Sequence, residues 1–107
     1  MMYTGKVDAE LGLGDAKKAA SLAALNALAV LERELDDLDK VELIVKMTGS
    51  VASSPGFVNQ PAVIDAASDT LVTVLGSRGK HARMAMGVAE LPARAPVAIE
   101  LIARVKS

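Results

Sequence analysis

The chain has 107 residues, 51% of them hydrophobic, and its 12 basic and 13 acidic residues give a formal net charge of −1. This length favours one domain, and the near-neutral charge argues against broad binding to a nucleic-acid backbone, which needs a basic face. Cysteine is absent, which excludes thiol catalysis and cysteine-based metal sites. No stretch resembles a signal peptide or a membrane span, so we expect a cytoplasmic protein.

The first half of the chain predicts an extended segment, a long helix and a strand. Residues 1–7 are expected to be extended, and residues 14–40 to form a helix that ends near an acidic run. Its apolar stripe is Ala20, Ala24, Ala27, Leu28, Leu31 and Leu35. Residues 41–51 alternate as a strand. One face of this strand is predicted to carry Val41, Leu43, Val45, Met47 and Val51, and the other Glu42, Ile44, Lys46, Thr48 and Ser50.

The second half predicts a helix over residues 61–76, with Pro61 at its start and Gly76 past its end. Its expected buried stripe is Ile64, Ala67, Leu71 and Val74. Residues 81–88 and 96–105 are expected to form a hairpin joined by residues 89–95. The order (short β)-α-β-α-β-β predicts an α+β fold in one domain over residues 1–107. Two helices would cover one face of the sheet, and at least one pair of strands would be parallel.

The alternation around Arg83 suggests a candidate anion site. If Met84 and Met86 face the helices, Arg83 points to the opposite face, flanked by small residues that leave room for a ligand. The hairpin register places Arg83 diagonally from Glu100. The residues leave two interpretations open: Arg83 binds an anion, or it pairs with Glu100 or with a carboxylate of another subunit. The mixed apolar and polar character of that face favours packing against a copy of itself.

The same residues resemble a known family. "GKHARMAMGVAELP" followed by "PVAIELIARV", together with "AASLAALNALAVLERELDDLDKVELIVKMTGSVASSPGF", is similar to the Rid/YjgF family over nearly the whole chain. The family consists of small trimeric proteins with a chorismate-mutase-like fold. Characterised members hydrolyse enamines and imines released by pyridoxal-phosphate enzymes, and some have been called L-PSP endoribonucleases or translation inhibitors. The family usually begins with a β-hairpin, and this chain resembles it from the segment after that hairpin.

The resemblance implies roles for individual residues. The family's substrate-binding arginine falls on Arg83, and Ala85 stands where many deaminases have a cysteine. Its water-positioning glutamate falls on Ala98, which leaves Glu100 as the acidic candidate on that strand. An asparagine expected near the start of the second helix corresponds to Asp65. We therefore expect substrate binding by Arg83 and Asp65, with Ala85 beside them.

His81 has the parity of Arg83 and is expected either at the mouth of the cleft or in an ordinary turn. The resemblance implies a homotrimer that binds a small carboxylate or imino acid between subunits, with no cofactor and no metal. The loss at Ala98 predicts little or no deaminase activity, because general acid–base help needs a proton-transferring group. One alternative is an active 2-iminobutanoate/2-iminopropanoate deaminase. The other is an endoribonuclease or translation inhibitor, which a single histidine and few aromatic residues do not favour.

Overall fold

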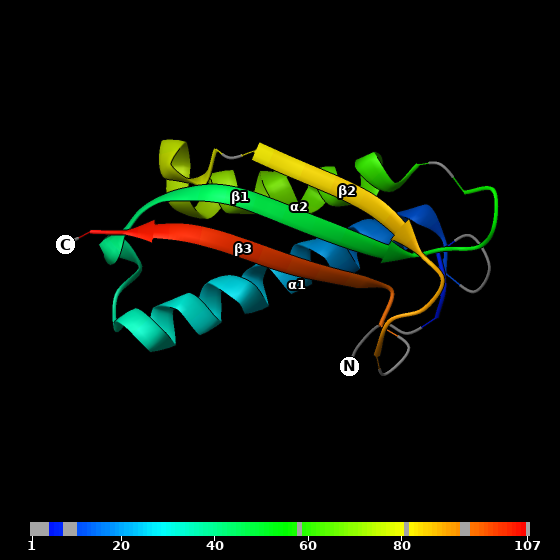
Figure 1. Ribbon diagram of the computed structural model, residues 1–107, viewed down its shortest axis with the longest axis horizontal. Helices are drawn as coiled ribbons and strands as arrows, with labels where there is room; N and C mark the ends of the chain where they lie inside the picture. The colour runs from blue at the N-terminus through cyan, green and yellow to red at the C-terminus, as the bar shows by residue number, and fades with distance from the viewer. Residues whose placement is uncertain (1–4, 8–10, 58, 81, 93–94, 107) are drawn as a thin grey trace.

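The computed structural model describes residues 5–7, 11–57, 59–80, 82–92 and 95–106, and shows two helices packed on one face of a mixed sheet (Figure 1). The elements are α1 (Leu13–Leu35), η1 (Leu38–Lys40), β1 (Val41–Ala52), α2 (Gln60–Leu75), η2 (Gly76–Gly79), β2 (Ala82–Val88) and β3 (Val97–Val105). The predicted α+β fold and the order α-β-α-β-β are confirmed. Of the expected first extended segment, residues 1–4 lie outside the described residues, and Val7 forms isolated bridges with Leu11 and Ser53.

The strand order is β2-β1-β3, with β1 parallel to β2 and antiparallel to β3. The expected parallel pairing is therefore confirmed, but the expected hairpin between the last two strands is wrong. The long strand β1 offers both of its edges, so the crossover through α2 places β2 on one side and the returning chain places β3 on the other (Figure 1). Residues of β2 and β3 are consequently separated by a whole strand.

Helix α1 buries a stripe of small side chains and ends earlier than the sequence suggested. Ala20, Ala24 and Leu28 are buried against the core, as expected from their helical spacing. The helix ends at Leu35 because Asp36 adopts a left-handed conformation with φ 70°, which acidic and amide side chains tolerate better than most. The expected continuation to residue 40 is instead a short 3-10 turn.

Helix α2 begins with Pro61 in its first turn and packs a stripe of three predicted residues, Ile64, Ala67 and Leu71, into the core. The fourth predicted residue, Val74, is exposed, and Leu75 is buried in its place. A step of four residues from Leu71 continues the stripe, whereas a step of three rotates the side chain toward solvent at this end of the helix.

The face pattern of β1 departs from simple alternation. The register against β3 shifts between Val41 and Leu43 and again between Ile44 and Lys46. Each such irregularity changes which side of the sheet the next residue faces. Ile44 is therefore buried and Val45 exposed, the reverse of the expected pattern, while Met47 stays in the core as predicted.

The faces of β2 are also reversed. Arg83 lies beside Met47 of β1, which is fully buried under the helices, whereas Met84 and Met86 are exposed on the face that carries no helix. The small residues explain the reversal. An added Cβ at Gly87 would lie 2.5 Å from Nε2 of Gln60, so the room on this side of β2 is taken by the first turn of α2.

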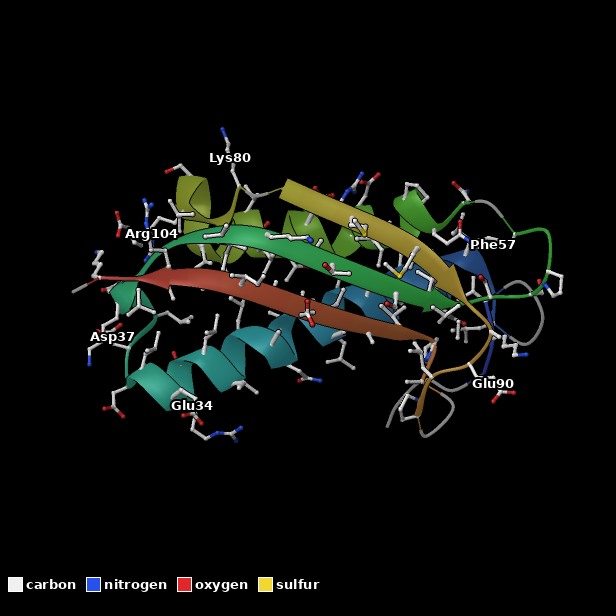
Figure 2. All side chains as sticks on the ribbon, in the orientation of Figure 1. Glu34, Asp37, Phe57, Lys80, Glu90 and Arg104 are labelled. Atoms are coloured by element: carbon white, nitrogen blue, oxygen red, sulfur yellow. The ribbon has the colours of Figure 1, made fainter. Side chains whose placement is uncertain are left out.

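The sheet face without helices is called the open face below, and it is turned toward the viewer in Figure 2. Its members are Lys46, Thr48, Ser50, Met84, Met86, Ala98, Glu100 and Ile102. On β3 the side chains alternate as in a regular strand: Val97 is buried, Ile99 and Leu101 pack against the core, and Glu100 and Ile102 are exposed. In the same view, the charged side chains of Glu34 and Lys80 lie at the periphery.

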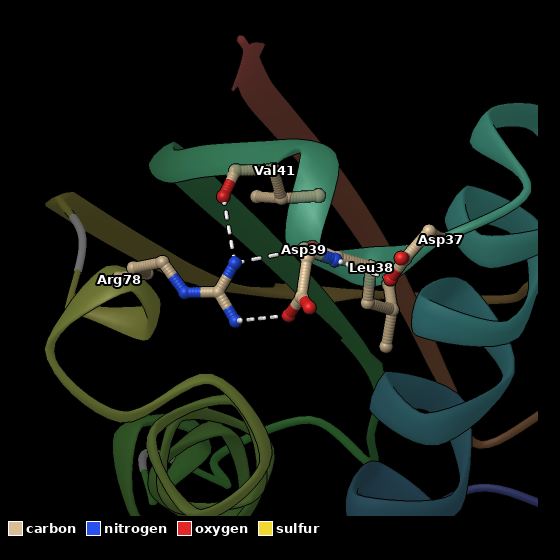
Figure 3. A network of polar contacts seen from close by, with 5 residues as sticks. All are labelled: Asp37, Leu38, Asp39, Val41 and Arg78. Atoms are coloured by element: carbon tan, nitrogen blue, oxygen red, sulfur yellow. Dashed lines mark hydrogen bonds and ion pairs between the residues drawn. The ribbon is translucent and has the colours of Figure 1, made fainter.

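Arg78 ties the short helices to the sheet. Its Nη1 donates hydrogen bonds to the carbonyl oxygens of Leu38 (3.1 Å) and Val41 (2.8 Å), and its Nη2 lies 3.8 Å from Oδ1 of Asp39 (Figure 3). Asp37 in turn accepts a hydrogen bond from the backbone N–H of Asp39. One guanidinium thus fixes where β1 starts relative to the end of α2.

Candidate functional site

Arg83 and Asp65 meet at the outer edge of the sheet. Arg83 lies on the edge strand β2 and faces the helix side, where its Nη1 donates a hydrogen bond to Oδ1 of Asp65 on α2. The side chain of Arg83 is 32% exposed and that of Asp65 58% exposed. The two residues for which the resemblance implied substrate binding are therefore in direct contact, and both are accessible from solvent.

Ala85 follows Arg83 on the same side of β2 and is half-buried beside Gly49 of β1. An added Cβ at Gly49 would lie 2.4 Å from Cδ1 of Ile64, so α2 packs tightly over this part of the sheet. Ala85 accordingly serves the packing of the strand under α2, and Arg83 is the position from which a long side chain can emerge past the helix.

Ala98 and Glu100 lie elsewhere. Both are exposed on the open face, where Ala98 pairs with Ser50 and Glu100 with Thr48. Arg83 points to the helix side of a different strand. The expected proximity of Arg83 to Glu100 is therefore wrong within one chain. His81, the remaining predicted binding residue, lies outside the described residues.

The open face combines apolar and polar side chains in one row. Met84, Thr48 and Glu100 are neighbours across the three strands, and Met84 and Ile102 are 46% and 50% exposed. Large exposed apolar side chains gathered on one face mark an interaction surface more often than isolated ones do. The face is thus suited to contact with another protein surface rather than to a small ligand.

A groove of about 310 Å³ runs between α1 and β3. Its lining is almost wholly apolar and consists of Ala19, Leu22, Ala23, Asn26, Ala27, Val30, Pro96, Val97, Ala98 and Ile99. With Asn26 as its one polar side chain, the lining offers no cation to pair with a carboxylate. It follows the outer edge of β3, the strand that ends the sheet on this side.

A second hollow, of about 340 Å³, lies where β1 and β2 end and α2 begins. Gln60 contributes an amide whose Nε2 donates to the carbonyl of Phe57 (2.8 Å) and to Oγ of Ser53 (3.4 Å), so its donors already have partners. Sequence reasoning missed Gln60. The glycine at 87, which lies against its amide, was the available signal.

Within the described ranges, no three histidine or carboxylate side chains are close enough together to hold a metal ion. The same residues include no helix that is both long and apolar enough to cross a membrane. Among the described residues, the candidate functional features are therefore the Arg83–Asp65 pair and the open face.

Comparisons with known proteins identify the family of this chain. The model of a family described as "YjgF/chorismate mutase-like, putative endoribonuclease" matches residues 1–105. The chain belongs to the YjgF/chorismate mutase-like family. Protein TCP17 of Trypanosoma cruzi is 39% identical over 100 residues, which are 92% of this chain and 62% of that protein. The chain thus spans less than two thirds of the length of this curated relative.

Two crystal structures share the fold. One, from Agrobacterium tumefaciens and of unknown function, has a TM-score of 0.97 and 42% identity over 99% of this chain and 68% of its own. The other, "a putative endoribonuclease" from Shewanella oneidensis MR-1, has a TM-score of 0.93 and 27% identity over 97% of this chain and 69% of its own. The membership and the fold that the resemblance implied are both confirmed.

Proposed function

We propose that this chain forms a cytoplasmic homotrimer with a cleft between subunits in which Arg83 binds a small carboxylate, and that it has little or no deaminase activity. The observation that carries the proposal is the position of Arg83. It belongs to an edge strand, its guanidinium reaches past α2, and a third of its side chain is exposed. The family's substrate-binding arginine falls on this residue.

The chemistry of a guanidinium supports the choice of ligand. Arginine carries five N–H donors in a planar fork that matches a carboxylate with two parallel hydrogen bonds. The structure shows Asp65 taking one of these through Nη1. The edge formed by Nε and Nη2 is then the natural place for a ligand carboxylate.

The open face supports the trimer. Its exposed apolar side chains would be covered if subunits met there, which removes apolar surface from water. Light scattering tests this on the purified chain, with a mass of three subunits expected. Met84→Glu should lower that mass, and Val72→Glu, a matched change at an exposed residue of α2, should leave it unchanged. A monomeric wild-type chain at micromolar concentration would overturn the trimer.

An active imine deaminase is the second candidate, favoured by the exposure of Glu100 on the open face. A carboxylate there, or one introduced by Ala98→Glu, points away from Arg83 of its own chain. It can approach a ligand on Arg83 only from a neighbouring subunit. Ala98→Glu should therefore raise the hydrolysis of a serine- or threonine-derived enamine only in the assembled protein, and the gain should vanish when Arg83→Ala is added.

The direct test of binding uses 2-oxobutanoate, a small carboxylate with a 2-oxo group. A ligand that binds only the folded state raises the melting temperature by mass action. Millimolar 2-oxobutanoate should raise it in the wild type and fail to do so in Arg83→Ala. An equal shift in both proteins would place the ligand elsewhere and overturn the role of Arg83.

A further inference from the structure

We propose that Asp65 determines which carboxylates Arg83 accepts, so that the site favours a zwitterionic α-amino acid over the 2-oxo acid with the same carbon skeleton. The inference rests on the proposed function of Arg83 and deepens it by naming the class of ligand. It assigns to Asp65 the role of a specificity residue rather than that of a catalytic one.

The first observation is the pairing itself. Asp65 accepts a hydrogen bond from the guanidinium of Arg83, and among the described residues neither side chain has a further hydrogen-bond or ion-pair partner. Both are exposed to a degree that leaves atoms free to meet a ligand. A cation donor and an anion acceptor thus lie side by side on one accessible edge of the molecule.

The second observation is the residue type. The resemblance implies an asparagine where this chain has Asp65. Asparagine is a neutral amide of nearly the same shape as aspartate. The carboxylate adds a negative charge next to the arginine and removes the two N–H donors of the amide. The side chain of Asp65 can therefore accept a hydrogen bond from the ligand but cannot donate one to it.

The consequence for ligands follows from Coulomb's law. A 2-oxo acid brings its carboxylate to a guanidinium that already holds an anion, and at a separation of a few ångströms two like charges near a protein surface repel appreciably. Its oxo group is an acceptor and finds no donor at Asp65. Its carboxylate can still take the Nε and Nη2 edge of Arg83, but the ligand carries no positive charge to offset its repulsion from Asp65.

An α-amino acid avoids this conflict. Its carboxylate can take the Nε and Nη2 edge of Arg83, while its ammonium, attached to the adjacent carbon, donates to a carboxylate oxygen of Asp65. Hydrogen bonds in which both partners are charged are about twice as strong as neutral ones. An imino acid protonated on nitrogen carries the same pair of charges and belongs to the same class.

The experiment compares 2-aminobutanoate with 2-oxobutanoate by isothermal calorimetry. The wild type should bind the amino acid about tenfold more tightly or better, the gain of one charge-assisted hydrogen bond. Asp65→Asn should remove or invert this preference, chiefly by binding the oxo acid more tightly, and Asp65→Glu should retain it. Asp69→Asn, which removes a charge one turn further along α2, is the matched control and should leave the ratio unchanged.

The outcomes separate the two proposals. If the oxo acid binds the wild type at least as tightly as the amino acid, and Asp65→Asn leaves the ratio unchanged, the role of Asp65 is wrong while Arg83 keeps its function. If neither acid binds the wild type, or both bind Arg83→Ala equally well, both proposals fail. An unfolding midpoint of Asp65→Asn close to that of Asp69→Asn shows that the comparison is made on folded protein.

Discussion

Arg78 and Arg83 lie five residues apart and are almost equally accessible, with side chains 30% and 32% exposed, yet they contact different kinds of partner. Arg78 directs its donors to two carbonyl oxygens of its own backbone and lies near Asp39. Arg83 reaches a single carboxylate on the surface of α2. Exposure therefore does not separate Arg78, which holds the backbone, from the arginine proposed to bind a ligand, whereas the destination of the donors does.

The backbone partners of Arg78 explain why its loss would be costly. The carbonyls of Leu38 and Val41 lie at the junction between η1 and β1, and the guanidinium gives both a charged donor, beside the backbone N–H of Val41 that the Leu38 carbonyl also accepts. The pair formed by Arg83 lies between two exposed side chains. Such surface pairs contribute between nothing and about 1 kcal/mol, because water and salt screen them.

Arg78→Ala should give the largest loss of stability. We expect the free energy of unfolding to fall by about 2–3 kcal/mol, since two hydrogen bonds from a charged group to the backbone disappear. Urea unfolding measures this as a lower midpoint with an unchanged slope. Arg83→Ala is the matched control and should cost below about 1 kcal/mol. Equal losses for the two variants would break the distinction.

Gly87→Ala should have an intermediate effect. Its new Cβ would approach Nε2 of Gln60 to 2.5 Å and Oγ of Ser53 to 3.2 Å, which forces the flexible amide to move and weakens its bond to Phe57. Overpacking of this size costs about 1 kcal/mol when the neighbour is a mobile chain end. Gly14→Ala, with no atom near the added Cβ, should not destabilise the protein.

Binding should distinguish the two explanations of the small residue at 87. If glycine serves only the packing of Gln60, carboxylate binding by Gly87→Ala stays within about twofold of the wild type. A loss of binding as large as that in Arg83→Ala would instead mean that the ligand extends along β2 from Arg83 to the space at Gly87.

Asp39→Asn should have the smallest effect. Asp39 is 84% exposed and its carboxylate lies 3.8 Å from Arg78, so the pair contributes below about 0.5 kcal/mol. Urea midpoints within error of the wild type are expected. A drop approaching that of Arg78→Ala would show that the ion pair, and not the backbone carbonyls, gives Arg78 its structural role.

The two arginines also show how far sequence reasoning reached. Helical periodicity correctly located both helices and most of their buried stripes, because that pattern is local. The neighbours of Arg83 depend on strand order, which is a long-range property. Assigning Met84 and Met86 to the helix side put Arg83 on the wrong face, and assuming a hairpin between the last two strands put it beside Glu100 instead of Asp65.

Bulges set the second limit. The irregular register of β1 reversed Ile44 and Val45, and nothing in the residue types at those positions marks the shift. The resemblance supplied Arg83 and Asp65 as binding residues, but only the fold shows that they touch. Small side chains at 85 and 87 indicated free space, whereas the structure fills that side with α2 and Gln60.

The central claim is that Arg83, and not Arg78, binds the carboxylate of a ligand. The most direct measurement is the change in melting temperature caused by millimolar 2-aminobutanoate and 2-oxobutanoate in Arg83→Ala and in Arg78→Lys. We predict that both shifts vanish in Arg83→Ala, while Arg78→Lys, although less stable, keeps the shifts of the wild type. Shifts that persist in Arg83→Ala and disappear in Arg78→Lys would contradict the claim.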